Sequence, residues 1–129
     1  MQGLHLTADL AGCRCDARWL TDAGALLAAC VQAVRAAGLR PVAQFAHAFD
    51  ATPDGPGGVT ATVLLAESHL CVHTWPERRG ATLDVYVCNV GGDHSAAARH
   101  LLDALLALLA PARTERHALR RGAVAEAAP

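Results

Sequence analysis

The sequence predicts an α+β fold, a two-layer sandwich in which an antiparallel sheet carries two helices on one face. In two separate segments, apolar residues recur every three or four positions, which is typical of a helix with one buried face. Around them, apolar and polar residues alternate in short segments, which is typical of strands. The predicted order is strand, helix, four strands, helix, strand, which favours helices gathered on one face of an antiparallel sheet.

The N-terminal half contains the first helix and a strand on either side of it. Residues 5–10 alternate weakly and are predicted to form a strand. The apolar face of the helix consists of Leu26, Leu27, Cys30, Val31 and Val34. We expect Thr21 to cap this helix at its N-terminus and Gly38, followed by Pro41, to end it. A second strand is predicted over residues 42–49.

The C-terminal half contains the other strands and the second helix. Residues 50–58 are dense in Pro, Gly and Asp and are predicted to form a loop. Strands are predicted over residues 59–66, 70–75, 81–88 and 113–119. Ser95 is expected to cap the second helix. Its apolar face consists of Leu101, Leu102, Leu105, Leu106 and Leu109.

Length and composition predict one cytoplasmic domain over residues 1–129. The apolar share of 53% is enough for one core, and the net charge of −1 shows no basic stripe for nucleic acid. The N-terminus does not have the pattern of a secretory signal. The longest apolar segment, 101–110, is too short to cross a membrane. Five cysteines, an odd number, favour a reducing compartment. We therefore expect no nucleic acid and no membrane partner.

The densest group of reactive side chains lies in residues 67–77, ESHLCVHTWPE. On a strand, His69, Cys71 and His73 would share one face. An ordinary strand with a polar face is one interpretation, but it leaves this concentration of Ser, His, Cys and Glu unexplained. A zinc-binding domain is a second interpretation, because His and thiolate groups are zinc ligands. The spacing is not a familiar zinc signature, so we expect no metal.

Nucleophilic chemistry at Ser68 is the third interpretation. A Ser hydroxyl is a poor nucleophile until a base or a strained backbone activates it. The sequence has no Gly-x-Ser-x-Gly turn, which disfavours a hydrolase triad. The remaining use of such a Ser is attack on the carbonyl that precedes it, which belongs to Glu67.

Residues 66–77, AESHLCVHTWPE, resemble the maturation motif of the short prokaryotic S-adenosylmethionine decarboxylases. Further matches in the same order are His5-Leu6, Cys15-Asp16, Phe49, Gly58-Val59-Thr60 and residues 83–88, LDVYVC. The resemblance therefore extends over about residues 5–94. It implies a pyruvoyl-dependent decarboxylase that cleaves itself into residues 1–67 and 68–129.

The resemblance implies roles for five residues in self-cleavage and catalysis. Ser68 attacks the carbonyl of Glu67, the chain breaks by β-elimination, and Ser68 becomes a pyruvoyl group. His73 removes the proton that drives the elimination, and Thr60 assists the processing. The pyruvoyl group forms a Schiff base with the substrate and accepts electrons as CO₂ leaves. Cys88 then returns a proton to the substrate carbon.

The absence of Lys agrees with such a cofactor. All eleven basic residues are Arg. A pyridoxal enzyme tethers its cofactor to a Lys, so a decarboxylase with this sequence needs another electrophile.

For the substrate, S-adenosylmethionine, the resemblance points to three binding residues. Phe49 and Trp75 would hold the adenine between two aromatic rings, with Trp75 reaching across the interface of a homodimer of processed protomers. Glu77 would accept hydrogen bonds from the ribose hydroxyls. The product would be decarboxylated S-adenosylmethionine, the aminopropyl donor for spermidine synthesis. Structural roles are expected for the remaining cysteines, Cys13, Cys15, Cys30 and Cys71.

Two departures from the family pattern border this site. The loop over residues 50–57 is longer than the family's turn, and Asn89-Val90 replaces the Gly that commonly follows Cys88. A related pyruvoyl-dependent arginine or ornithine decarboxylase is therefore an alternative. A non-catalytic regulatory paralogue is another, although it would have no need of Ser68, His73 and Cys88 together.

Overall fold

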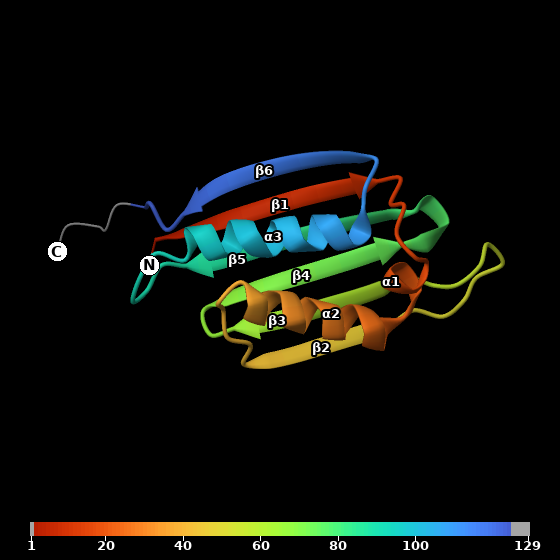
Figure 1. Cartoon of the computed structure of the whole chain (residues 1–129), viewed down its shortest axis with the longest axis horizontal. Helices are drawn as coiled ribbons and strands as arrows, with labels where there is room; N and C mark the ends of the chain where they lie inside the picture. The colour runs from red at the N-terminus through yellow and green to blue at the C-terminus, as the bar shows by residue number, and fades with distance from the viewer. Residues whose placement is uncertain (1, 125–129) are drawn as a thin grey trace.

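The computed structural model describes residues 2–124, which form one six-stranded antiparallel sheet with its helices on one face (Figure 1). The strands are β1 (Gly3–Ala11), β2 (Ala43–Ala48), β3 (Val59–Leu65), β4 (Ser68–Trp75), β5 (Gly80–Cys88) and β6 (Arg113–Arg121). The helices are α1 (Arg18–Thr21), α2 (Ala23–Ala36) and α3 (Ser95–Leu109), with a 3₁₀ turn, η1, at Pro76–Arg78. The sheet order is β2-β3-β4-β5-β1-β6. The predicted α+β sandwich is confirmed.

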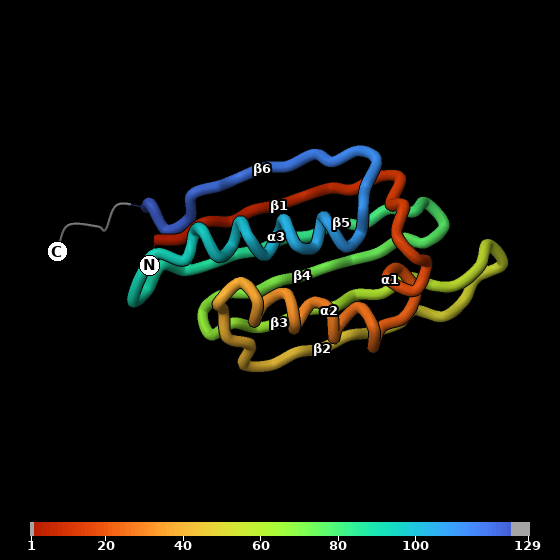
Figure 2. Tube along the Cα trace, in the orientation of Figure 1, coloured from red at the N-terminus to blue at the C-terminus, as the bar shows by residue number. Residues whose placement is uncertain are grey.

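The hydrophobic core lies between the sheet and the two long helices. In Figure 2, α3 runs over β5 and β1, and α2 runs over β3 and β2. The largest fully buried side chains are Leu6, Leu20, Leu26, Leu70, Leu101, Leu102, Leu105 and Leu109. Burial of each contributes about 1.5–3 kcal/mol. We call the other side of the sheet, which no described helix covers, the open face. Within residues 2–124, no helix is long and apolar enough to span a membrane.

The prediction that Thr21 caps α2 is wrong. The N-cap is Asp22, whose Oδ1 accepts a hydrogen bond from the Ala25 amide at 3.0 Å. Thr21 instead ends α1, and its hydroxyl donates to the Ala17 carbonyl at 3.0 Å. A four-residue helix is too short to show a periodic pattern. At the start of α2, the negative charge of Asp22 is also favoured by the helix dipole.

The prediction that Ser95 caps α3 is also wrong. Ser95 is the first residue of α3, and its amide donates to the Asp93 carboxylate at 2.9 Å. This hydrogen bond lowers the pKa of Asp93 below its ordinary value. The N-cap position belongs to His94, whose side chain makes no capping bond. At both helices an Asp carboxylate therefore accepts a hydrogen bond from an amide of the first turn. Each Asp lies one or two residues from the Thr or Ser that was predicted to be the cap.

The segment between β2 and β3 projects beyond the end of the sheet (Figure 1). β2 ends at Ala48, one residue earlier than predicted, and the Phe49 amide then donates to the Gly58 carbonyl at 2.9 Å. A short antiparallel bridge joins Thr52 and Gly55. We call residues 50–57 the finger loop.

Thr74 joins α1, β3 and β4 beneath the finger loop. It is the one buried polar residue in the described part of the chain. Its hydroxyl donates to the Leu20 carbonyl at 2.7 Å and accepts from the Val59 amide at 2.8 Å. A Cβ at Gly58 would lie 2.0 Å from the Thr74 carbonyl oxygen, so a Gly is required there. This junction therefore depends on the pair of residues Thr74 and Gly58.

Replacing Thr74 with Val keeps the side-chain shape and removes both hydrogen bonds. We expect the free energy of unfolding to fall by about 2–4 kcal/mol, because two buried backbone groups lose their partner. Urea denaturation in a Ser68→Ala background, where the expected self-cleavage cannot occur, measures the change. As a control, Thr114→Val on the exposed strand β6 should change stability by less than about 0.5 kcal/mol. Equal losses for the two variants would contradict this account.

Candidate functional site

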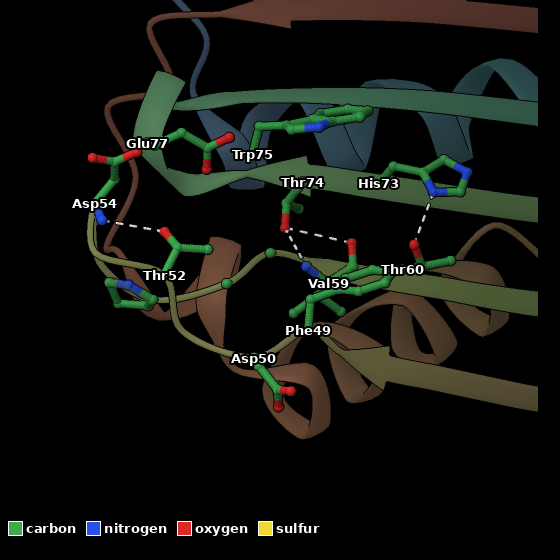
Figure 3. Close-up of a pocket in the computed structure, with 13 residues that line it drawn as sticks. Phe49, Asp50, Thr52, Asp54, Val59, Thr60, His73, Thr74, Trp75 and Glu77 are labelled. Carbon is green, nitrogen blue, oxygen red and sulfur yellow. Dashed lines mark hydrogen bonds between the residues drawn. The ribbon is translucent and has the colours of Figure 1, made fainter.

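The predicted site residues form two groups at opposite ends of β4. Glu67, Ser68 and Cys88 line a cavity where β4 begins. A second cavity, where β4 ends, is lined by Phe49, Thr60, His73, Trp75 and Glu77 (Figure 3). Ser68 and His73 are five residues apart on an extended strand, which separates them by about 17 Å. One chain therefore does not bring the predicted base to the predicted nucleophile.

The bond between Glu67 and Ser68 lies at a tight turn. Leu65 of β3 pairs with Ser68 of β4, so only Ala66 and Glu67 connect the two strands. Ala66 has a φ of 56°, in the left-handed region that residues with a side chain seldom adopt. This conformation costs about 1–2 kcal/mol. The turn therefore holds backbone strain one residue before the predicted cleavage site.

The end of β5 holds the Ser68 hydroxyl in place. The Cys88 amide donates to Ser68 Oγ at 2.9 Å, and both residues line the same cavity. Because Oγ accepts this bond, the hydroxyl keeps its own proton for transfer to a base. Cys88 itself is buried, with 7% of its surface exposed. The arrangement places the nucleophile against the backbone of Cys88, a residue that lines the same cavity.

Arg40 and His94 also line the Ser68 cavity, and the sequence analysis assigned neither. Arg40 follows the end of α2, and His94 precedes the start of α3. Neither residue belongs to a motif. Their proximity to Ser68 follows from the way both helices end over the β3–β4 turn, which local sequence patterns do not show.

The structure brings Thr60 and His73 together, as their predicted shared role requires. They are directly paired across β3 and β4, and Thr60 Oγ1 lies 2.9 Å from His73 Nδ1. This hydrogen bond orients the imidazole ring on the open face. When Nδ1 carries the ring proton and donates it to Thr60 Oγ1, Nε2 on the other side of the ring can accept a proton from a group outside this pair.

Two aromatic side chains border the second cavity from different elements (Figure 3). Trp75 ends β4 and lies beside His73, with their ring centroids 6.3 Å apart. Phe49 follows β2 and packs edge-on against His47 at 4.7 Å. Phe49 and Trp75 are 55% and 42% exposed, which leaves their rings available to a ligand. The cavity volume of about 520 Å³ is typical of small-molecule sites.

The finger loop adds two carboxylates that the sequence analysis did not assign. Asp50 and Asp54 line this second cavity together with Glu77 (Figure 3). Three acidic groups and no Arg line the cavity, so its potential favours a cationic ligand. The unusual length of the loop in the sequence was the only signal for this contribution.

Burial raises the pKa of four cysteine thiols that lie outside these cavities, Cys13, Cys15, Cys30 and Cys71. It raises the pKa of Cys30, on the buried face of α2, to about 12. Burial is also the main cause of the raised pKa values of Cys13 and Cys71. These side chains therefore remain protonated thiols at neutral pH.

The three side chains of the zinc interpretation share a face but do not converge. Successive side chains on one face of a strand lie about 7 Å apart. Cys71 Sγ lies 2.9 Å from Thr62 Oγ1, and His73 bonds to Thr60. His69 instead meets Asp84, with Nε2 and Oδ2 2.7 Å apart. The trio of His69, Cys71 and His73 is therefore not a metal site.

The sequence model of the S-adenosylmethionine decarboxylase family matches residues 4–122. This span includes both cavities and nearly all of the described chain. The chain belongs to this family. The match confirms the resemblance that the maturation motif indicated, and it favours S-adenosylmethionine decarboxylase over the arginine, ornithine, regulatory and zinc alternatives.

Individual members of the S-adenosylmethionine decarboxylase family are similar over most of their length. The proenzyme of Aquifex aeolicus is 40% identical over 125 residues, which cover 96% of this chain and 84% of the relative. The proenzyme of Pyrobaculum arsenaticum is 39% identical over 114 residues, covering 88% and 82%. The crystal structure of the adenosylmethionine decarboxylase of Aquifex aeolicus has a TM-score of 0.80 at 35% identity, covering 98% and 96% of the two chains.

The strain at Ala66 can be measured as a gain in stability. Replacing Ala66 with Gly in the Ser68→Ala background should raise the free energy of unfolding by up to about 1 kcal/mol, because Gly adopts a positive φ without steric cost. Ala104→Gly, at an exposed position inside α3, should instead lower it by about 1 kcal/mol. A loss at both positions in urea denaturation would show that the turn is unstrained.

Proposed function

We propose that this chain is an S-adenosylmethionine decarboxylase that makes a pyruvoyl cofactor by cleaving itself between Glu67 and Ser68. The observation that carries the proposal is the placement of Ser68. It follows a strained turn, its Oγ is held by the Cys88 amide, and it shares a cavity with the Cys88 thiol. Membership in the family supplies the reaction class.

Self-cleavage begins when Ser68 Oγ attacks the Glu67 carbonyl carbon. The C–N bond breaks as a C–O bond forms, so an ester replaces the amide and the Ser68 nitrogen becomes an amine. A base then removes the Cα proton of Ser68, and Glu67 leaves as a new terminal carboxylate. Water replaces the nitrogen of the remaining dehydroalanine, and ammonia is released. Strain at Ala66 favours the first step, because the turn relaxes when the amide is lost.

The pyruvoyl group supplies a carbonyl that condenses with the substrate amine and draws electrons as CO₂ leaves. The residues around Ser68 fit this cofactor. Once the chain is cut, the new N-terminus is the first residue of β4, which strand pairing keeps in place. Cys88 lies beside it and can return a proton to the substrate carbon.

We assign His73 and Thr60 to the processing step across a homodimer interface. A two-fold axis that crosses the strands near Cys71 would place the start of β4 opposite the end of the partner's β4. The partner's His73 would then lie over the start of β4, next to the backbone of Ser68, although the two residues are about 17 Å apart within one chain. The same axis would bring the partner's Trp75 to this end of the sheet.

The open face is suited to such an interface. It carries large apolar side chains that no described element covers, among them Phe45, which is 74% exposed, together with Leu64, Trp75 and Leu119. Exposed apolar groups gathered on one surface are typical of contact with another protein. A second copy of the same sheet would bury them and complete both catalytic sites.

The second cavity supports S-adenosylmethionine as the substrate. Phe49 and Trp75 offer two aromatic surfaces for adenine, and Glu77 offers a carboxylate to the ribose hydroxyls. The acidic lining, which includes Asp50 and Asp54, favours a positively charged sulfonium ligand. The product would serve as an aminopropyl donor for spermidine synthesis. We place the enzyme in the cytoplasm, where its free thiols stay reduced.

Intact mass spectrometry of the purified protein tests the self-cleavage. We expect two chains, residues 1–67 and 68–129, with a pyruvoyl group in place of the first Ser of the second chain. The Ser68→Ala variant should remain one chain because it has no nucleophile. The cleaved protein should release CO₂ from S-adenosylmethionine. Activity on arginine or ornithine alone would overturn the substrate, and a folded, uncleaved chain would overturn the cofactor.

Co-expression of two inactive variants tests the shared site. Ser68→Ala lacks the nucleophile, and His73→Asn should cleave about 10²–10⁴-fold more slowly without its base. In a mixed dimer, Ser68 of the His73→Asn chain faces an intact His73 on the other chain. We therefore expect the His73→Asn chain to be cleaved in the mixture. A tag on one chain identifies the fragments by mass spectrometry.

A matched control for this experiment replaces Ser68→Ala with the double variant Ser68→Ala/His73→Asn. That mixture contains no His73 at all and should stay uncleaved. If tagged pull-down shows that mixed dimers form and the His73→Asn chain remains whole in both mixtures, the base does not act across the interface.

A further inference from the structure

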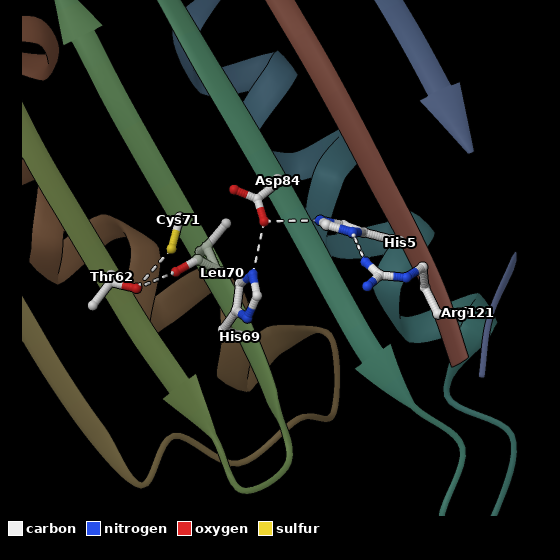
Figure 4. Close-up of polar contacts among 7 residues, drawn as sticks. All are labelled: His5, Thr62, His69, Leu70, Cys71, Asp84 and Arg121. Carbon is white, nitrogen blue, oxygen red and sulfur yellow. Dashed lines mark hydrogen bonds and ion pairs between the residues drawn. The ribbon is translucent and has the colours of Figure 1, made fainter. Parts of the chain in front are cut away.

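A group of polar side chains lies on the open face between the two cavities. His5, His69 and Asp84 come from β1, β4 and β5, and their donor atoms lie within 4.8 Å of one another (Figure 4). Asp84 Oδ2 lies 3.0 Å from His5 Nε2 and 2.7 Å from His69 Nε2. The proposed decarboxylation uses none of these three side chains.

Strand register explains why these side chains meet. Tyr86 of β5 pairs with His5 on one side and with His69 on the other, which places the two imidazoles in one row across the sheet. Asp84 lies two residues before Tyr86 on the same face. The Tyr86 ring contacts both imidazoles, with centroids 5.6 Å and 5.8 Å away. The two imidazole rings are nearly perpendicular, at 88°, and both present Nε2 to the same carboxylate oxygen.

We propose that His5, His69 and Asp84 bind a divalent transition-metal ion of the Zn²⁺ type. Two imidazole nitrogens and one carboxylate oxygen are ligands that suit Zn²⁺, whereas Mg²⁺ and Ca²⁺ prefer oxygen alone. Zn²⁺ ligand atoms lie about 2.0–2.2 Å from the ion. With ligand–ion–ligand angles between a right angle and the tetrahedral angle, two such atoms lie about 2.9–3.4 Å apart. The two N–O separations of 3.0 Å and 2.7 Å are within a few tenths of an ångström of this range.

In the single chain the site is accessible and leaves coordination positions open. The three side chains are between 19% and 33% exposed there, so an ion can enter before the open face packs against a second copy. Three protein ligands leave at least one position for water or another ligand. The register therefore brings the three donors together, and binding requires side-chain rotation that draws the two imidazole nitrogens, which lie within 4.8 Å of each other, onto one ion.

Arg121 competes with the metal for His5. Its Nη1 lies 2.9 Å from His5 Nδ1, and a guanidinium group can only donate. His5 Nδ1 is therefore the acceptor, and the proton of the neutral ring lies on Nε2, where it is donated to Asp84. A metal ion at Nε2 requires that proton to move to Nδ1 or to be released. Arg121 must then leave His5, and it has room to do so at the exposed end of β6.

Isothermal titration with Zn²⁺ tests the site in the full chain. The same titration of the uncleaved Ser68→Ala variant makes the result independent of the proposed self-cleavage. We expect one ion per chain and weaker binding at lower pH, because the ion displaces protons. His69→Asn and Asp84→Asn should each weaken binding at least about tenfold. His100→Asn, which removes an exposed histidine of α3, should leave it unchanged.

Arg121→Leu provides a test that misfolding cannot imitate. Removing the competing donor should tighten Zn²⁺ binding about fivefold, the equivalent of one net hydrogen bond. Binding of equal strength in the unsubstituted chain, His69→Asn and Asp84→Asn would overturn the site. Binding lost in Cys71→Ser but kept in Asp84→Asn would also overturn it, since a thiol would then be the ligand.

Discussion

The alternation of side chains along β4 is the constraint on which the rest of the structure depends. Leu70, Val72 and Thr74 point into the core, so His69 and His73 must point the other way. A shift of one residue would bury the histidines and expose the core residues, which fixes the register strongly. Each reactive side chain of the motif is therefore positioned by the apolar residue next to it.

The length of the same strand explains why one chain contains two incomplete sites. An eight-residue strand is rigid when it is paired on both sides, so its ends cannot approach each other. The nucleophile and thiol lie at one end, and the imidazole and aromatic rings lie at the other. The centre of the open face carries the His5, His69 and Asp84 group. Packing the sheet against a copy of itself would bring the end of one β4 over the start of the other. The centre of the open face would then lie in the same interface.

The sequence predicted what depends on neighbours along the chain and missed what depends on pairing between distant strands. Leu26, Cys30, Val31 and Val34 were placed correctly on the buried face of α2 because helical periodicity is a local property. Asp22 was missed as a cap because two adjacent residues could both serve, and only the geometry of α1 decides between them. The meeting of His5 with Asp84, 79 positions away, depends on a register that no local pattern contains.

The sheet order has a further consequence if the chain is cut after Glu67. β1 would belong to the first fragment, yet it lies between β5 and β6 of the second, and β3 and β4 would also pair across the cut. The two fragments would be interleaved, so neither could leave without breaking the ladder on both sides of β1. After cleavage, unfolding would therefore also separate two chains, whereas the uncut protein unfolds as one molecule. The stability of the matured protein would then depend on its concentration, while its shape stays the same.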